Sequence, residues 1–213
     1  MYSKYTGIIL KKHPFNEADE LLTIYTREAG KLRCKSISSR KLQSRLGGHL
    51  QTLNEIQFET AGSNNSSASA LPVLTSVRAL RINSYLRENL RKFAAVLVGV
   101  ETVYRLLPDR QENQQVYEAI LEFLTRLGLA VDENFEVRRF QLELLKHAGY
   151  AFPANDYDLG EASRKQLSEL SVGQSSFRLG REIELAIDRF LNYVLEREIK
   201  SSRFLRTLNQ DSS

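Results

Sequence analysis

The sequence predicts an α+β chain in which a small five-stranded β-barrel precedes an all-helical domain. Short apolar runs rich in β-branched and aromatic residues fill the first 82 positions, whereas apolar residues recur with the helical period of 3.6 after Ile82. The chain has 213 residues, 42% of them hydrophobic and 26% charged, which is typical of a globular protein with one or two domains. We therefore expect a barrel domain at residues 1–82 and a helical domain at 83–213.

The barrel prediction depends on five expected strands. They cover Thr6–Leu10, Leu21–Thr26, Lys31–Ser38, Leu53–Thr60 and Val73–Ile82. Gly30 supplies the permissive backbone of the turn between the second and third strands. Leucines recur every four residues from Leu42 to Leu50, which predicts a short amphipathic helix over Arg40–Gln51. Five strands with a helix before the fourth are the pattern of an OB-fold barrel.

A loop of low complexity separates the last two strands. Residues 61–70 read AGSNNSSASA, and this small, polar composition predicts a mobile loop. In OB-folds the loop at this position helps to hold oligonucleotides.

Six helical segments are expected after Ile82. They run from Asn83 or Ser84 to Leu107, from Val116 to Gly128, over Phe135–Ala148, over Gly160–Leu170, over Ile183–Leu195 and within the tail Ser201–Ser213. Asn83 or Ser84 is a suitable N-cap for the first of these helices, and Pro108 ends it. Gly149 is placed to end the third.

Basic residues are concentrated in the barrel domain. Residues 1–82 contain 12 Lys and Arg against 6 Asp and Glu, whereas the remaining residues contain 18 against 20. This asymmetry favours a polyanion, such as a nucleic acid, as the partner of the barrel, and a surface that merely keeps the chain soluble is the alternative.

No pattern of residues predicts catalysis. The P-loop motif is missing, and His13, His49 and His147 lie in different segments without metal-ligand spacing. The single cysteine, Cys34, excludes an internal disulfide and a zinc site with several cysteines, and its position in a strand favours a buried structural thiol. We expect no enzyme activity, no cofactor and no bound metal.

The expected location is the cytoplasm. The most apolar stretch, Phe93–Val100, is too short to span a membrane, and residues 1–12 lack the pattern of a secretory signal. One cysteine in the whole chain suits a reducing compartment.

Six cations form the predicted nucleic-acid site and are called the basic row below. They are Lys31, Arg33, Lys35, Arg40, Lys41 and Arg45. The first three alternate along one strand, so they share a face and lie about 7 Å apart, while Leu32 and Cys34 point toward the barrel core. Such a row can follow a phosphate backbone, and the alternative is a solvated edge that discourages aggregation. Phe15 and Tyr25 are suited to stack on bases or to pack in the core.

Two arginines of the helical domain form a second predicted site. Arg138 and Arg139 flank an apolar face that contains Phe135, Phe140 and Leu144. A basic surface beside an apolar one can receive an acidic peptide tail that ends in an aromatic residue. The alternative is that the two side chains are ordinary surface arginines beside a core.

Several segments, in order and spacing, resemble the RecO family of bacterial DNA repair proteins. They are YTGIIL at 5–10, NEADELLT at 16–23, TREAGKL at 26–32, SRL at 44–46, LQ at 50–51, RRFQLELL at 138–145, AGY at 148–150 and IKSSRFL at 199–205. The resemblance runs from about residue 2 to residue 206. The family combines an N-terminal OB-fold with a C-terminal helical domain.

The resemblance implies a mediator of recombinational DNA repair without catalytic turnover. Members of the family bind single- and double-stranded DNA and anneal complementary strands. With RecR they help to load RecA onto DNA that is coated by single-strand-binding protein, whose acidic tail is the expected ligand of Arg138 and Arg139. The basic row falls in the corresponding segment of the family, and the implied location is the bacterial cytoplasm, at the nucleoid.

One feature separates this chain from many of its relatives. Many relatives have a four-cysteine zinc module after the equivalent of Gly149 and Tyr150, but residues 151–173 contain no cysteine, so we expect the zinc module to be absent.

The alternative function is an OB-fold RNA-binding or ribosome-associated factor, because a basic barrel does not by itself distinguish DNA from RNA.

Overall fold

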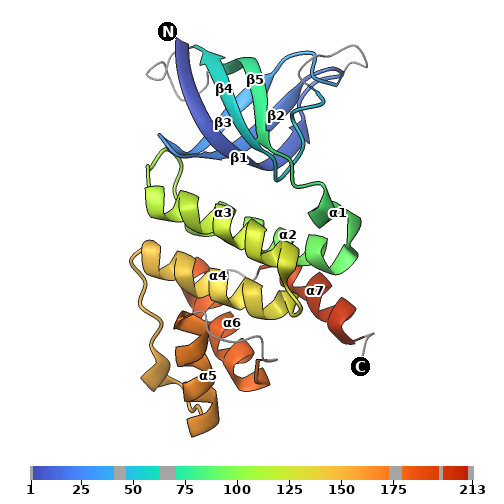
Figure 1. Ribbon diagram of the computed structural model, residues 1–213. Helices are drawn as coiled ribbons and strands as arrows, with labels where there is room; N and C mark the ends of the chain where they lie inside the picture. The colour runs from blue at the N-terminus through green and yellow to red at the C-terminus, as the bar shows by residue number, and fades with distance from the viewer. Residues whose placement is uncertain (1, 41–46, 63–70, 173–178, 197–198, 211–213) are drawn as a thin grey trace. The chain divides into compact units, whose positions relative to one another are not determined.

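The computed structural model describes residues 2–40, 47–62, 71–172, 179–196 and 199–210, which form two compact units (Figure 1). The barrel unit consists of Met1–Ser84 together with Pro108–Tyr117, and the helical unit consists of Tyr85–Leu107 together with Glu118–Ser213. The barrel unit is therefore discontinuous in sequence, because the connection between two helices returns to it.

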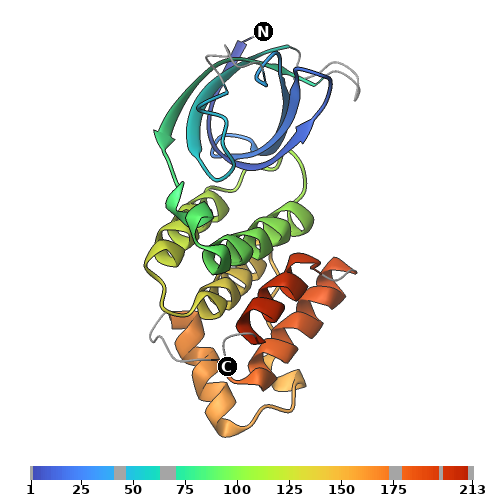
Figure 2. The same ribbon diagram turned by 90° about the vertical axis from the view of Figure 1, so that its right-hand side faces the viewer.

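Five strands form a closed barrel, which confirms the predicted OB-fold. They are β1 (Tyr2–Pro14), β2 (Glu20–Thr26), β3 (Gly30–Ser36), β4 (Glu55–Ala61) and β5 (Val73–Arg81). The strand order around the barrel is β1-β2-β3-β5-β4, and Figure 2 shows the strands as a ring. All neighbours are antiparallel except β3 and β5, which pair in parallel at Lys35 and Val73.

The interior of the barrel is apolar, as the alternation in the sequence predicts. Its core contains Tyr5, Ile9, Leu22, Ile24, Leu32, Cys34, Leu50, Ile56, Phe58 and Leu74. The rings of Tyr5 and Phe58 pack with their centroids 5.5 Å apart. Burying side chains of this size is the main source of stability of a small barrel.

β1 is longer than the sequence pattern predicts. Its first half pairs with β4, its second half pairs with β2, and a bulge between Ile9 and Lys11 joins the two parts. A bulge bends a strand locally, so one strand can serve two neighbours in a closed barrel. Exposed residues at both ends of β1 hide this length from a search for apolar runs.

The helix predicted over Arg40–Gln51 is not seen in the described part of that segment. Gly47, Gly48 and His49 form a turn, and residues 41–46 lie outside the described residues. Most of the predicted loop at 61–70 lies outside them as well.

The helical unit follows the predicted order of helices. The elements are α1 (Tyr85–Glu88), α2 (Leu90–Leu106), α3 (Gln114–Leu129), α4 (Glu133–His147), the 3-10 helix η1 (Ala154–Asp156), α5 (Glu161–Val172), α6 (Arg181–Leu195) and α7 (Ser201–Gln210). The first turn of α3 belongs to the barrel unit. α2 packs against α4 and α7, and the stacked rings of Phe123 and Phe140 lie 4.2 Å apart beside Gly99 of α2. A Cβ at position 99 would lie 2.5 Å from the Phe123 ring, so this packing requires glycine.

The first predicted helix is divided into α1 and α2, and Ser84, one of its two predicted caps, directly precedes α1. Asn89 caps α2, because its side chain accepts hydrogen bonds from the backbone N–H groups of Arg91 and Lys92, both at 3.0 Å. Asn83 is buried in the barrel unit, where its side-chain amide donates to the carbonyl of Leu53 at 2.8 Å. Two asparagines of equal capping ability stand close together, and tertiary contacts decide between them.

In the part of the chain that the structure describes, no helix is both long enough and apolar enough to cross a membrane.

Candidate nucleic-acid interface

Strand β3 separates its side chains as the spacing of the basic row predicts. Leu32 and Cys34 are buried in the barrel core, and Arg33 points outward with 48% of its side chain exposed. Burial raises the pKa of the Cys34 thiol to about 12, so the thiolate does not form at neutral pH and the residue is structural. Lys31 also lies on the outer face, but only 8% of its side chain is exposed.

A carboxylate that is distant in sequence partly neutralises this face. Asp109 lies 3.2 Å from the ammonium of Lys31 through one oxygen and 3.1 Å from the guanidinium of Arg33 through the other. The two cations are therefore held side by side by one acid. No acid occurs between Lys31 and Gln51 in the sequence, so local charge counting does not reveal this contact.

Asp109 is held in place because its segment pairs with the free end of β3. Lys31 and Asp109 form a parallel β-bridge, and the N–H of Arg110 donates to the Lys31 carbonyl at 2.9 Å. Gly30 has φ of 65°, and a Cβ there would lie 1.9 Å from the carbonyl oxygen of Gln111. The segment Pro108–Tyr117, called the strap below, thus covers the part of the β3 edge that β5 does not reach.

The far end of the strap is anchored by a buried tyrosine. The hydroxyl of Tyr117 donates to Oε1 of Glu55 in β4 at 2.8 Å, and the guanidinium of Arg27 lies over the Tyr117 ring at 5.0 Å. Burial and the adjacent carboxylate raise the pKa of Tyr117, so the hydroxyl remains a donor. The pairing of Tyr117 with Glu55 spans 62 positions, and no sequence pattern indicated it.

Two other members of the basic row meet the loop between β1 and β2. The ammonium of Lys35 lies over the ring of Phe15, 4.7 Å from its centroid. The Arg40 guanidinium donates to the carbonyls of Asn16 at 3.3 Å and Glu17 at 3.1 Å. Lys41 and Arg45, which complete the basic row, lie outside the described residues.

An acidic residue of that loop and the first residue of β2 hold the chain after β3. Asp19 accepts a hydrogen bond from the N–H of Ser38 at 2.8 Å, and Glu20 accepts one from the hydroxyl of Ser39 at 2.9 Å. The β1–β2 loop and the segment that follows β3 therefore form one structure, called the loop cluster below, which consists of residues 15–20 and 35–40.

Phe15 and Tyr25, the two proposed stacking residues, differ in exposure. Phe15 is 46% exposed in the loop cluster. Tyr25 is buried, and burial raises its pKa to about 12, so it is a packing residue.

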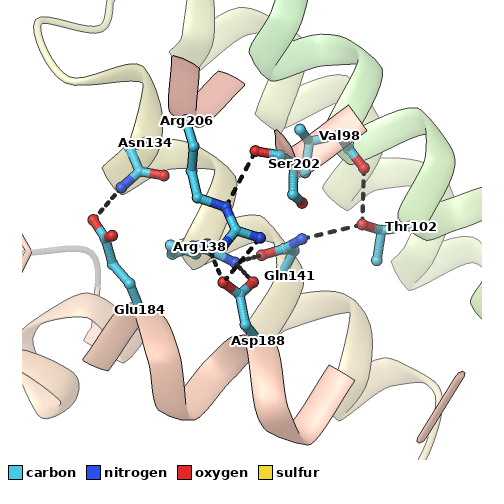
Figure 3. A network of polar contacts seen from close by, with 9 residues as sticks. All are labelled: Val98, Thr102, Asn134, Arg138, Gln141, Glu184, Asp188, Ser202 and Arg206. Atoms are coloured by element: carbon cyan, nitrogen blue, oxygen red, sulfur yellow. Dashed lines mark hydrogen bonds and ion pairs between the residues drawn. The ribbon is translucent and has the colours of Figure 1, made fainter. Parts of the chain in front are cut away.

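The helical unit buries one of the two arginines predicted to bind a partner. Figure 3 shows Arg138 of α4 in a polar network. Only 4% of its side chain is exposed. Its guanidinium donates to both carboxylate oxygens of Asp188 in α6, at 2.6 and 3.1 Å, and to the side-chain oxygen of Gln141 at 2.9 Å. Gln141 in turn donates to Thr102 of α2 at 3.2 Å. A partner would have to displace Asp188 to reach Arg138, so this geometry favours a structural role.

Arg139 lies nearer the surface. Its guanidinium is 4.0 Å from the carboxylate of Glu122 in α3. Binding of a partner by Arg139 stays a prediction.

The sequence after Tyr150 contains no cysteine, so it lacks the four cysteines of the zinc module that the family resemblance implies. The chain's one cysteine, Cys34, is in the barrel core, and within the described residues no three His, Cys, Asp or Glu side chains gather as a metal site would require. After Tyr150 an aromatic cluster holds the chain instead. The ring of Phe152 stacks on Tyr157 and meets the edge of Phe190 of α6, each with centroids 5.4 Å apart.

Both parts of the chain match models of one protein family. Residues 1–80 match the model for the N-terminal domain of recombination protein O, and residues 87–157 match the model for its C-terminal domain. The first match covers the barrel strands, and the second extends from α1 to η1.

Curated relatives carry the same name. The DNA repair protein RecO of Anaeromyxobacter dehalogenans is 28% identical over 147 residues, which cover 69% of this chain and 57% of that protein. The RecO of a Roseiflexus species is 30% identical over 144 residues, or 68% of this chain and 49% of the relative. The chain thus spans about half the length of these two proteins. The RecO of Pelotomaculum thermopropionicum is 22% identical, with 97% of this chain and 94% of the relative aligned. Together, the two domain matches and these relatives show that the chain belongs to the RecO family.

Proposed function

We propose that the protein is a mediator of recombinational DNA repair that binds single- and double-stranded DNA and anneals complementary strands without catalytic turnover. With RecR it would help to load RecA onto DNA that is coated by single-strand-binding protein. The membership of both domains in the RecO family supports a role in DNA repair and recombination.

The observation that carries the DNA-binding part is the outward row of cations at one end of the barrel. Arg33 and Lys35 alternate with buried residues on β3, and Arg40 follows in the loop cluster. Phosphate contacts from such side chains bind a strand without reading its sequence, which suits a protein that must accept any pair of complementary strands.

The proposal is tested by titrating labelled single-stranded DNA, RNA and duplex DNA over a series of salt concentrations. We expect DNA to bind at least as tightly as RNA, with a logarithmic salt slope of about −0.7 for each phosphate contact on a single strand. Replacing Arg33 and Lys35 by Gln should weaken binding and make the slope shallower by about 1.4. A variant with Lys165→Gln and Arg181→Gln, two exposed cations of the helical unit, is the matched control.

Each outcome of this titration has a definite meaning. Equal losses in the two double variants would contradict the assignment to β3. A clear preference for RNA would replace DNA repair by the RNA-binding alternative. If the wild-type protein binds DNA, acceleration of strand annealing and capture of RecR test the remaining steps.

A further inference from the structure

We propose that Phe15 is a stacking platform for one base of a single strand, with Lys35 on one face of its ring and the base on the other. This inference rests on the proposed function and assigns to the barrel a contact that selects unpaired bases. It adds an aromatic residue from outside the basic row to the binding surface.

The first support is the position of the ring. Phe15 is 46% exposed, although burial of a phenyl ring is favourable. The Lys35 ammonium covers one part of the ring at 4.7 Å from the centroid, and the exposed remainder is available to a planar group. The Lys35 ammonium beside the ring adds a positive charge to this part of the surface, and that charge attracts the phosphates of a strand. An exposed aromatic next to cations is the arrangement that proteins use to bind single strands without sequence preference.

The second support is that the loop is held in a fixed conformation. The N–H of Phe15 donates to the carbonyl of Asp19 at 3.1 Å, and Arg40 ties the next two carbonyls to the segment after β3. Because these hydrogen bonds fix the backbone of the loop before a strand binds, binding costs little conformational entropy.

Stacking also agrees with strand annealing. A base that stacks on Phe15 is held by its face, so its pairing edge remains free for a complementary strand. In a duplex each base is already stacked between its neighbours, so no base face is open for the Phe15 ring to contact. The platform therefore favours single strands over the annealed product and assists release of the duplex.

The absence of tryptophan from the chain allows a direct test. In Phe15→Trp the new indole is the sole tryptophan, and we expect an oligothymidylate of about 20 nucleotides to quench its fluorescence. Tyr2→Trp is the control, since Tyr2 is 76% exposed at the opposite end of β1 and should not be quenched. In Phe15→Leu, which keeps an apolar side chain, affinity for the single strand should fall at least about fivefold while the salt slope and the affinity for duplex DNA stay unchanged.

The outcomes separate this inference from the proposed function. If wild-type protein binds no DNA, the proposed function fails, and the stacking inference fails with it. If wild-type protein binds but Phe15→Leu is equally tight and Phe15→Trp is not quenched, only the stacking inference is overturned. Equal losses for single-stranded and duplex DNA in Phe15→Leu, with a changed salt slope, would mean that the ring merely positions Lys35, and this result also overturns it.

Discussion

At the scale of the residue, Asp109 determines how much positive charge β3 presents. Its two oxygens lie against Lys31 and Arg33, where the oxygens of a DNA phosphate would be attracted. A phosphate at this point must therefore compete with a carboxylate that the fold already supplies. The competition is reduced by solvent, because Asp109 is 45% exposed.

We therefore expect Asp109→Asn to bind single-stranded DNA about threefold more tightly at low salt, since Arg33 is then free to meet a phosphate. The same change should lower the free energy of unfolding by about 1 kcal/mol, because the nearly buried Lys31 loses the carboxylate of Asp109. The loss stays this small because solvent partly screens the exposed carboxylate. Titration of DNA and thermal unfolding measure the two effects. Glu112→Gln removes an exposed acid from the same strap and is the control. Equal gains in affinity from both variants would indicate a general charge effect instead of a local competition.

The residue scale also shows what sequence alone can predict about the site. The alternation of Arg33 with Leu32 and Cys34 follows from strand geometry, and the structure confirms it. Asp109 is 76 positions from Arg33, and no local pattern indicates a contact over that separation. The burial of Lys31 depends on its tertiary surroundings and was missed for the same reason.

At the scale of the element, α7 begins on a carboxylate from another helix. Glu101 of α2 accepts hydrogen bonds from the N–H of Lys200 at 3.1 Å, from the N–H of Ser201 at 2.8 Å and from the Ser201 hydroxyl at 2.5 Å. Burial by itself raises the pKa of Glu101, but these hydrogen bonds and the charge of Arg105 outweigh it, so the pKa lies below its ordinary value of 4.5. The carboxylate replaces the side-chain cap that a helix N-terminus needs.

The lowered pKa fixes the direction of the pH effect. Stability from Glu101 is fully present above pH 4.5, the ordinary value, and is lost as the pH falls through the lower value of the folded state. Glu101→Gln should cost about 1 kcal/mol at pH 7 and should lose less stability than wild type on acidification. Unfolding by urea between neutral and acid pH measures both. Glu122→Gln, which breaks an exposed pair with Arg126 one turn away, should cost under about 0.5 kcal/mol and serves as the reference. If the free energy of unfolding of Glu101→Gln falls on acidification as steeply as that of wild type, the capping role is disproved.

Elements with a strong apolar period were predicted well, whereas their ends were not. The strands and helices occur in the predicted order because burial of one face fixes each of them. The division of the first predicted helix into α1 and α2 was missed, because Asn83 is held in the barrel by Leu53 and Asn89 takes the cap. Capping propensity does not distinguish two asparagines that differ only in their tertiary contacts.

At the scale of the whole molecule, the barrel unit is completed by a segment that the helical part of the sequence supplies. A division at residue 82, as the change in periodicity suggests, assigns the strap to the helical domain. In the structure the strap instead pairs with β3 at Lys31 and reaches β4 through Tyr117 and Glu55. The barrel edge and the charge of the face that we propose binds DNA therefore depend on residues that follow α2.

Gly30 offers a single position at which the strap can be displaced. A methyl group there would meet the carbonyl of Gln111 at 1.9 Å, and φ of 65° is a left-handed conformation that alanine adopts at a cost. We expect Gly30→Ala to lower the free energy of unfolding by at least about 2 kcal/mol and to speed amide exchange at Arg110, whose N–H bonds to Lys31. Gly48→Ala is the matched control, because a methyl group at position 48 meets no atom within 4 Å and the backbone there is not left-handed. Similar stability of the two variants, with Arg110 still protected, would show that glycine at position 30 is not required for the strap to pair with β3. Displacement of the strap also removes Asp109 from Lys31 and Arg33, so Gly30→Ala should approach the DNA affinity of Asp109→Asn at a temperature where the barrel remains folded.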